Sequence, residues 1–66
     1  MQRKDISAGR RYGHREKREI PHDHIVLYIG IYTRNGEELV IHRPSHKTEV
    51  IYCEPIEIFM ERFYKK

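Results

Sequence analysis

The sequence predicts a small, mainly β protein of the α+β class, in which an antiparallel barrel or meander of three to five strands is capped by a C-terminal helix. Three short runs rich in β-branched and aromatic residues lie between Ile25 and Cys53, and such runs are typical of strands. Two turn signals, Asn35-Gly36 and the segment from Arg43 to Lys47, separate these runs. After Pro55 the apolar residues change from the period of a strand to that of a helix.

The first strand is expected from Ile25 to Thr33. Its odd positions are mostly aliphatic, which suits a core, whereas its even positions carry Tyr28 and Tyr32 on either side of Gly30 and suit a partly solvated surface. A glycine inside a strand indicates a bulge, a sharp bend or the close approach of another backbone. We therefore expect this strand to curve, as a small barrel requires.

Asn35-Gly36 indicates a hairpin, because a type I′ turn needs positive φ at both central residues. A two-residue loop would place Tyr32 opposite Leu39, whereas a three-residue loop with a glycine bulge would place Ile31 opposite Leu39. These registers exchange the faces of the second strand, which is expected from Glu38 to His42. The bulged register joins more aliphatic side chains and is favoured for that reason, but both registers stay open.

The second strand must end near Arg43, because Pro44 cannot donate a hydrogen bond to a sheet. A second turn then leads to a third strand from Glu49 to Cys53. Strand alternation places Tyr52 and Cys53 on opposite faces, and the thiol is expected to be a small buried apolar group.

A C-terminal helix is predicted over residues 55–64. Pro55 suits the first helical position, and the apolar residues after it are spaced at i, i+3, i+4 and i+7. These residues are Ile56, Phe59, Met60 and Phe63. We expect this apolar stripe to cover one open end of the sheet, because three or four strands alone bury too little apolar surface.

The chain divides into a basic arm over residues 1–11 and a single small domain over residues 12–66. Residues 1–19 contain seven Lys and Arg against three acids, a net charge of +4, whereas residues 20–66 contain six against seven, a net charge of −1. The arm has no apolar period, so we expect it to be flexible until residues 10–14 form a short extended lead or strand. Such an arm either keeps a small protein soluble or contacts nucleic acid or an acidic protein surface.

The chain contains one cysteine, so no disulfide can form within it, and this fits a reducing compartment. The apolar run over residues 25–32 is far shorter than the roughly 20 residues that a membrane span requires. The basic start has no apolar segment behind it that would make a secretory signal. We therefore expect a cytoplasmic protein that does not enter a membrane. No cofactor is expected, because no phosphate-binding loop or other enzyme motif appears.

The histidines raise the question of a metal site. They are His14, His22, His24, His42 and His46. His22 and His24 would share a face if the first strand began early, and Cys53 or Asp23 could join them. Structural zinc sites, however, use close pairs of cysteine and histidine, and one cysteine is too few for the common patterns. We therefore expect surface histidines near turns, no metal site, and no thiol nucleophile at Cys53.

Tyrosines and arginines form the most informative candidate surface. On a small barrel, an aromatic face with arginines between the rings can bind peptides, or can stack bases and neutralise phosphates. The candidate binding residues are Tyr12, Tyr28, Tyr32, Tyr52, Arg10, Arg11, Arg34 and Arg43. The alternative is that most of these rings cover a thin core.

Two segments in the second half of the chain carry a family resemblance. Gly36 to Ile41 (Gly-Glu-Glu-Leu-Val-Ile) and Glu54 to Phe59 (Glu-Pro-Ile-Glu-Ile-Phe) resemble the short bacterial domain-of-unknown-function family 1653. The resemblance extends over Tyr12 to Phe63, with Tyr52 where that family usually has tryptophan and Glu54 where it usually has arginine. It implies a small β fold similar to an SH3-like barrel, and it lends no activity, because the family has no settled one.

These observations lead to two main hypotheses about function. The first is a non-enzymatic binding module that acts through a protein partner as a regulator or inhibitor, or that dimerises through an exposed strand edge. A phage-encoded protein would fit this description. The second is a nucleic-acid-binding module that uses the basic arm and the tyrosine–arginine surface. An enzyme is the weakest hypothesis, because Glu37 and Glu38 diverge across a strand and make no acid–base pair.

Overall fold

The computed structural model describes residues 1–15 and 23–66, which contain one antiparallel sheet, one α-helix and one short 3₁₀-helix. In chain order the elements are η1 (Arg3–Asp5), β1 (Arg11–His14), β2 (His24–Tyr32), β3 (Glu37–Pro44), β4 (Tyr52–Pro55), α1 (Ile56–Arg62) and β5 (Phe63–Lys65). The interpretation of His22 as a metal ligand falls outside the described residues. Of the two alternatives left open for residues 10–14, an extended lead or a short strand, β1 shows that the strand is correct.

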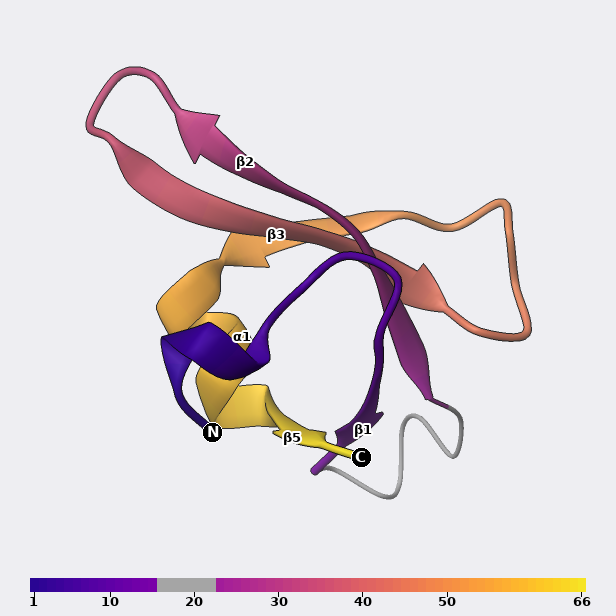
Figure 1. The fold of residues 1–66 in the computed structure, drawn as a ribbon. Helices are drawn as coiled ribbons and strands as arrows, with labels where there is room; N and C mark the ends of the chain where they lie inside the picture. The colour runs from indigo at the N-terminus through magenta and orange to yellow at the C-terminus, as the bar shows by residue number, and fades with distance from the viewer. Residues whose placement is uncertain (16–22) are drawn as a thin grey trace.

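The five strands form an open sheet in the order β4-β3-β2-β1-β5. Figure 1 shows the long β2–β3 hairpin crossing the molecule, with α1 and η1 on the same side of it. Among the described residues, β4 and β5 are the two edges of the sheet, so the barrel is not closed. The predicted class, a small β-rich α+β fold with a C-terminal helix, is confirmed. No helix in the described part of the chain has the length and apolar character that a membrane crossing needs.

The β2–β3 hairpin closes through a four-residue turn, so neither of the two predicted registers is correct. Tyr32 pairs with Glu37. Of the two central residues proposed for a type I′ turn, only Gly36 has positive φ, at 75°. The Gly36 N–H donates to the Tyr32 carbonyl at 2.8 Å, and the Asn35 side-chain oxygen accepts the Glu37 N–H at 2.9 Å. The sequence signal therefore locates the turn correctly but gives the wrong turn type.

The wider turn also decides which face of β3 is inside. Ile29 pairs with Val40, so these two side chains share a face and both contact the core. A two-residue loop would have kept the same faces, because its register differs by two residues. The favoured three-residue loop would have put Leu39 and Ile41 inside, and it is wrong.

A β-bulge divides β2 into two parts. The pairing with β3 shifts between Val26 and Tyr28, so Leu27 is the extra residue. Val26 is fully buried before the bulge, and Ile29 packs against the core after it. The predicted aliphatic odd face is therefore correct only beyond the bulge, and the irregularity lies at Leu27 rather than at Gly30.

The core lies between the inner face of the sheet, α1 and the N-terminal segment. Its buried apolar members are Ile6, Tyr12, Val26, Val40, Ile56, Phe59 and Phe63. Phe59 and Phe63 stack with ring centroids 4.4 Å apart, and Phe59 meets Tyr12 edge to face at 5.4 Å. The apolar stripe of the predicted helix is thus confirmed, with Met60 partly buried beside it. The helix ends at Arg62, because Phe63 already has extended φ and ψ and begins β5.

The third strand begins later than the predicted Glu49. β4 starts at Tyr52, and the segment before it forms a wide turn. The Arg43 guanidinium fastens the start of that turn, because its Nη1 donates to three backbone carbonyls between residues 44 and 47 at 3.0 to 3.4 Å. Pro55 ends β4 and precedes α1 as its N-cap rather than as its first helical residue.

The N-terminal segment packs on the body, which corrects the expectation of a flexible arm. Ile6 is 3% exposed and belongs to the core. The Tyr12 hydroxyl donates to the Asp5 carbonyl at 2.7 Å and accepts the Ser7 N–H at 3.0 Å. A single isoleucine in a polar stretch has no period, so the sequence pattern does not reveal its burial.

Candidate functional site

Apolar side chains line the face of the β2–β3–β4 sheet that is turned away from the core. Cross-strand partners share a face, and the register pairs Tyr28 with Ile41 and Ile41 with Cys53. Their chain neighbours Ile29 and Val40 point inward, so these three side chains point outward. We call this surface the outer face. It consists of Tyr28, Leu39, Ile41 and Cys53, with Ile51 at the same alternation just before β4.

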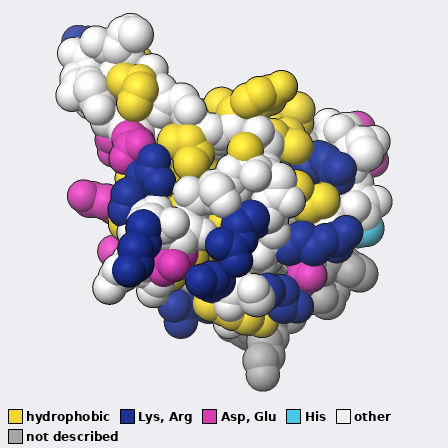
Figure 2. Space-filling view, viewed as in Figure 1, with side chains coloured by type: hydrophobic (Ala, Val, Ile, Leu, Met, Phe, Trp, Pro, Cys, Tyr) yellow, Lys and Arg dark blue, Asp and Glu magenta, His cyan; other side chains and the backbone are white. Residues whose placement is uncertain are grey.

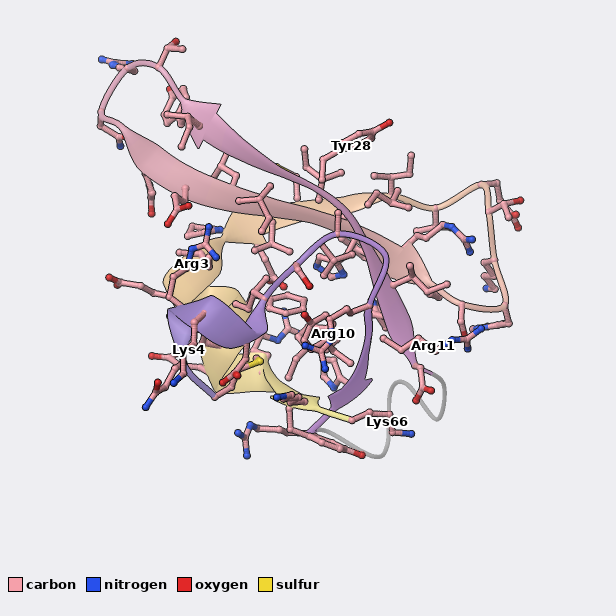
Figure 3. All side chains as sticks on the ribbon, in the orientation of Figure 1. Arg3, Lys4, Arg10, Arg11, Tyr28 and Lys66 are labelled. Carbon is pink, nitrogen blue, oxygen red and sulfur yellow. The ribbon has the colours of Figure 1, made fainter. Side chains whose placement is uncertain are left out.

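Three residues of the outer face, Tyr28, Ile51 and Cys53, are exposed to solvent, whereas Leu39 and Ile41 are half-buried. Tyr28 is 70% exposed and Ile51 is 61% exposed. Cys53 is exposed as well, so the expectation of a buried thiol is wrong. In Figure 3 Tyr28 points away from the body, and in Figure 2 hydrophobic side chains gather along the upper side of the molecule while Lys and Arg cover the front below. Contiguous exposed apolar surface is uncommon on isolated proteins and often marks a binding site.

Three of the candidate binding residues follow the outer face toward the tip of the hairpin. Tyr28 lies at its centre, and Tyr32, 43% exposed, lies on the same side of β2. Arg34 is exposed in the turn that follows. Arg43 is half-buried, and the carbonyls of the second turn already occupy its guanidinium. The predicted tyrosine–arginine surface therefore exists only in part.

The other four candidates lie elsewhere. Tyr12 is fully buried in the core, so the prediction that it belongs to a binding surface is wrong. Tyr52 shares the inner face with His42, its cross-strand partner, and is 44% exposed at the sheet edge. Arg10 and Arg11 are exposed at the start of β1, on the other half of the sheet.

On the inner face of the same sheet, three histidines are buried together. His14, His24 and His42 come from β1, β2 and β3 and are 6%, 1% and 2% exposed. The ring centroids of His24 and His42 are 5.0 Å apart, and those of His14 and His24 are 6.2 Å apart. Phe63 packs on all three rings, and Tyr52 covers two of them from β4. The expectation of surface histidines is wrong for these three residues.

A chain of hydrogen bonds runs from Glu54 through His42 to His24. The His42 Nε2 lies 3.0 Å from Glu54 Oε1, and its Nδ1 lies 2.8 Å from His24 Nδ1. An ionised carboxylate can only accept, so His42 donates from Nε2 and accepts at Nδ1 from the Nδ1–H of His24. The Nε2 of His24 then carries only a lone pair, and it is buried without a hydrogen-bond partner among the described residues. Such an unpaired buried acceptor costs roughly 1–3 kcal/mol.

Burial controls the protonation of this cluster. Removal from water lowers the pKa of His24 and of His42 from 6.5 to about 4 in each case, and positive neighbours add to the effect. Both rings are therefore neutral at pH 7, and the contact between His42 and Glu54 is a hydrogen bond rather than an ion pair. Burial also raises the pKa of Glu54, against the charge of Arg62, whose Nη1 lies 3.6 Å from Glu54 Oε2.

The cluster does not have the arrangement of a metal centre. The described residues contain no group of three or more His, Cys, Asp and Glu side chains placed to hold an ion. Cys53 is on the outer face, opposite to His24, and the Asp23 carboxylate pairs with Lys66 at 2.8 Å. The sheet thus places Cys53 and His24, two of the residues that the sequence suggested as joint ligands, on opposite faces.

Comparisons with family models, with curated proteins and with solved structures found no match for this chain. The resemblance to family 1653 therefore stays a prediction.

The buried histidines are what sequence reasoning missed. His42 lies two residues after Val40, so both must share a face of β3, and the hairpin register would have placed that face inside. His24 has the same relation to Val26. The signal is present in the alternation, but it becomes readable only when the register and the bulge are known.

Proposed function

We propose that this chain is a non-enzymatic binding module whose outer face docks on a protein partner, and that it acts as a regulator or inhibitor of that partner in the cytoplasm. The observation that carries the proposal is the exposure of Tyr28, at 70%, in the middle of apolar neighbours on three adjacent strands. Aromatic residues at the centre of an apolar patch are frequent energetic centres of protein interfaces.

The size of the chain is compatible with this role. Its accessible surface is 4676 Å², and a standard interface takes about 800 Å² from each partner, which is roughly one sixth of that surface. The core residues Val40 and Phe59 support the β2–β3–β4 sheet from its inner side. Firm surfaces bind at a smaller entropic cost than flexible ones.

The direct test is site-specific photocrosslinking in the cells that encode the chain. A benzophenone amino acid replaces Tyr28 in one version and Ile58 in a control version. Ile58 is 40% exposed on α1, away from the outer face. We expect a discrete adduct from position 28 that is absent from position 58 and that excess unlabelled wild-type chain suppresses.

A disruptive variant makes the test sharper. Ile51→Glu places a charge at the edge of the outer face, outside any strand, and should abolish the adduct from position 28 without lowering the melting temperature. An adduct of twice the chain's own mass would identify a second copy as the partner. Equal adducts from positions 28 and 58, or no adduct from position 28, would overturn the proposal.

A further inference from the structure

The phenol end of a tyrosine packs directly on a glycine, on the half of the sheet that the outer face does not include. In the β1–β5 ladder, Gly13 pairs with Tyr64, between the pairs Tyr12 with Lys65 and His14 with Phe63. A Cβ added to Gly13 would overlap the end of the Tyr64 ring, so the ring rests directly on the Gly13 backbone. Tyr64 is nevertheless 41% exposed. Tyr64 therefore combines a close contact with the Gly13 backbone and a substantial solvent-exposed area.

Exposed cations flank this ring on the same side of the two strands. Tyr12 and His14 point into the core, so the alternating residues Arg11 and Arg15 lie on the Gly13 side of β1. Lys66 follows Tyr64 by two residues, so by the same alternation it lies on the Tyr64 side of β5. One step beyond the pairing of Tyr12 with Lys65, Arg11 faces Lys66, and both side chains lie over this part of the sheet in Figure 3.

The positive charges of Arg11 and Lys66 repel each other across the two strands. Like charges opposite each other on neighbouring strands destabilise a sheet. The hydrogen bond from Lys66 to Asp23 raises the pKa of the lysine, and the positive charge of Arg11 acts against this rise. Among the described residues Asp23 is the acidic side chain that pairs with Lys66, and no ion pair is found for Arg11. The cationic side chains of this surface therefore outnumber the acidic one, and a bound anion would reduce their mutual repulsion.

We propose that the surface formed by Arg11, Gly13, Arg15, Tyr64 and Lys66 binds single-stranded nucleic acid, with one base stacked on Tyr64 and phosphates contacting the three cations. An exposed ring that lies flush with the surface can stack on an unpaired base, and every base has a face that suits it. A duplex keeps its bases stacked on one another and would offer only phosphates. An acidic peptide would use the cations without the ring.

This second surface is independent of the outer face. Tyr28 and Tyr64 lie on different strand pairs, β2–β3 and β1–β5. Binding at the Tyr64 surface therefore does not depend on whether the outer face docks on a protein.

The test is fluorescence anisotropy of a labelled single-stranded thymidine 12-mer titrated with the full chain. We expect micromolar to submillimolar binding that weakens with salt, with a slope of log K against log salt near −2 for about three phosphate contacts at roughly 0.7 each. Tyr64→Leu should weaken binding about tenfold, and Tyr64→Phe should keep it, because stacking needs the ring and not the hydroxyl.

Two further variants test whether binding depends on the position of the Tyr64 ring and whether it is specific to this surface. Gly13→Ala should displace the Tyr64 ring and weaken binding although Tyr64 is still there, because the ring's far end has to move. Tyr28→Leu, on the outer face, should leave the affinity unchanged. Circular dichroism establishes that each variant is folded before binding is compared.

Three results would each overturn the inference. The first is the absence of binding at low salt. The second is equal affinity of the wild type and Tyr64→Leu, which would leave only diffuse attraction to the basic surface. The third is equal binding of a matched DNA duplex or of polyglutamate, since neither presents an unpaired base to the ring.

Discussion

The two faces of the β2–β3–β4 sheet both depart from the usual division of a half-buried sheet, because the inner face buries polar side chains beside the apolar core and the outer face exposes apolar ones. Antiparallel sheets usually place apolar residues inside and polar ones outside. Here the inner face buries His24, His42 and most of Glu54, whereas the outer face exposes Tyr28 and Cys53. Buried imidazoles cost stability and exposed apolar groups cost solubility, so folding alone explains neither. The contrast supports two proposals: that protonation of the inner face controls stability, and that the outer face binds a partner.

The largest expected effect on the free energy of unfolding comes from removing the Phe59 side chain, which packs in the core beneath the inner face. Phe59 is fully buried, stacks on Phe63 and touches Tyr12, so Phe59→Ala should cost roughly 3–5 kcal/mol. That loss is comparable with the whole stability of a small domain. Urea unfolding followed by circular dichroism measures it. Ile58→Ala, one position earlier on the exposed side of α1, is the control and should change the unfolding free energy by less than about 1 kcal/mol.

The histidine cluster predicts a loss of stability in mild acid. The pKa values of His24 and His42 are about 4 in the folded chain against 6.5 when unfolded, so the unfolded chain binds more protons between these values. The stabilisation is complete above pH 6.5 and is lost as the pH falls toward 4. From pH 7 to pH 5 each histidine contributes a loss of roughly 2 kcal/mol. The raised pKa of Glu54 acts in the opposite direction and offsets part of the sum.

Thermal unfolding between pH 7 and pH 5 checks this dependence. The double variant His24→Leu/His42→Leu should remove most of it, because both members of the buried hydrogen bond are replaced by apolar groups. His46→Gln, at an exposed position, should keep it. A melting temperature that stays constant from pH 7 to pH 5 in the wild type would show that the rings are solvated rather than buried.

A smaller effect is expected from the N-terminal segment. Ile6→Ala should cost about 2–3 kcal/mol if Ile6 belongs to the core. Lys4→Ala, at an exposed position of the same segment, should cost almost nothing. Chemical denaturation distinguishes the two variants. Equal stability of both would mean that Ile6 does not pack in the core and that the N-terminal segment is a flexible arm, as the composition suggests.

The smallest effect on stability is expected on the outer face. Tyr28→Ser should change the unfolding free energy by less than about 0.5 kcal/mol, because the side chain is largely exposed and has few contacts to lose. The same variant should lose partner binding. A loss of 2 kcal/mol or more in stability would mean that Tyr28 supports the fold, and the outer face would then lose its status as a binding surface.

The sequence was sufficient for those features that depend on local chemistry. Residues with a clear period or a special backbone preference gave correct predictions, such as the apolar stripe of α1 and the turn at Gly36. Features that depend on register were not accessible. The extra residue at Leu27 lets both Val26 and Ile29 face inward, although regular strand alternation would place them on opposite faces, and no composition rule marks that bulge.

The same limit applies to the candidate sites. The exposure of Tyr28 was predicted, because the even positions of its strand, with tyrosines on either side of Gly30, suit a partly solvated surface. His24 and His42 were expected at the surface and are buried, and Cys53 was expected to be buried and is exposed. Each outcome depends on the face that the register assigns to the residue. The packing of Tyr64 on Gly13 arises from a contact between strands about fifty residues apart in the chain, which a local pattern does not contain.

Cys53 provides the most direct measurement of the central claim, that the outer face is bare in the free chain and covered in the cell. It is the single cysteine of the chain and lies on that face. Its alkylation by iodoacetamide can be followed by mass spectrometry for the dilute folded protein, for the urea-unfolded protein and for the protein in its native cells. The account predicts similar rates in the folded and unfolded chain, and strong protection in cells that the Ile51→Glu variant abolishes. Slow alkylation of the dilute folded chain, or equally fast alkylation in cells, would contradict it.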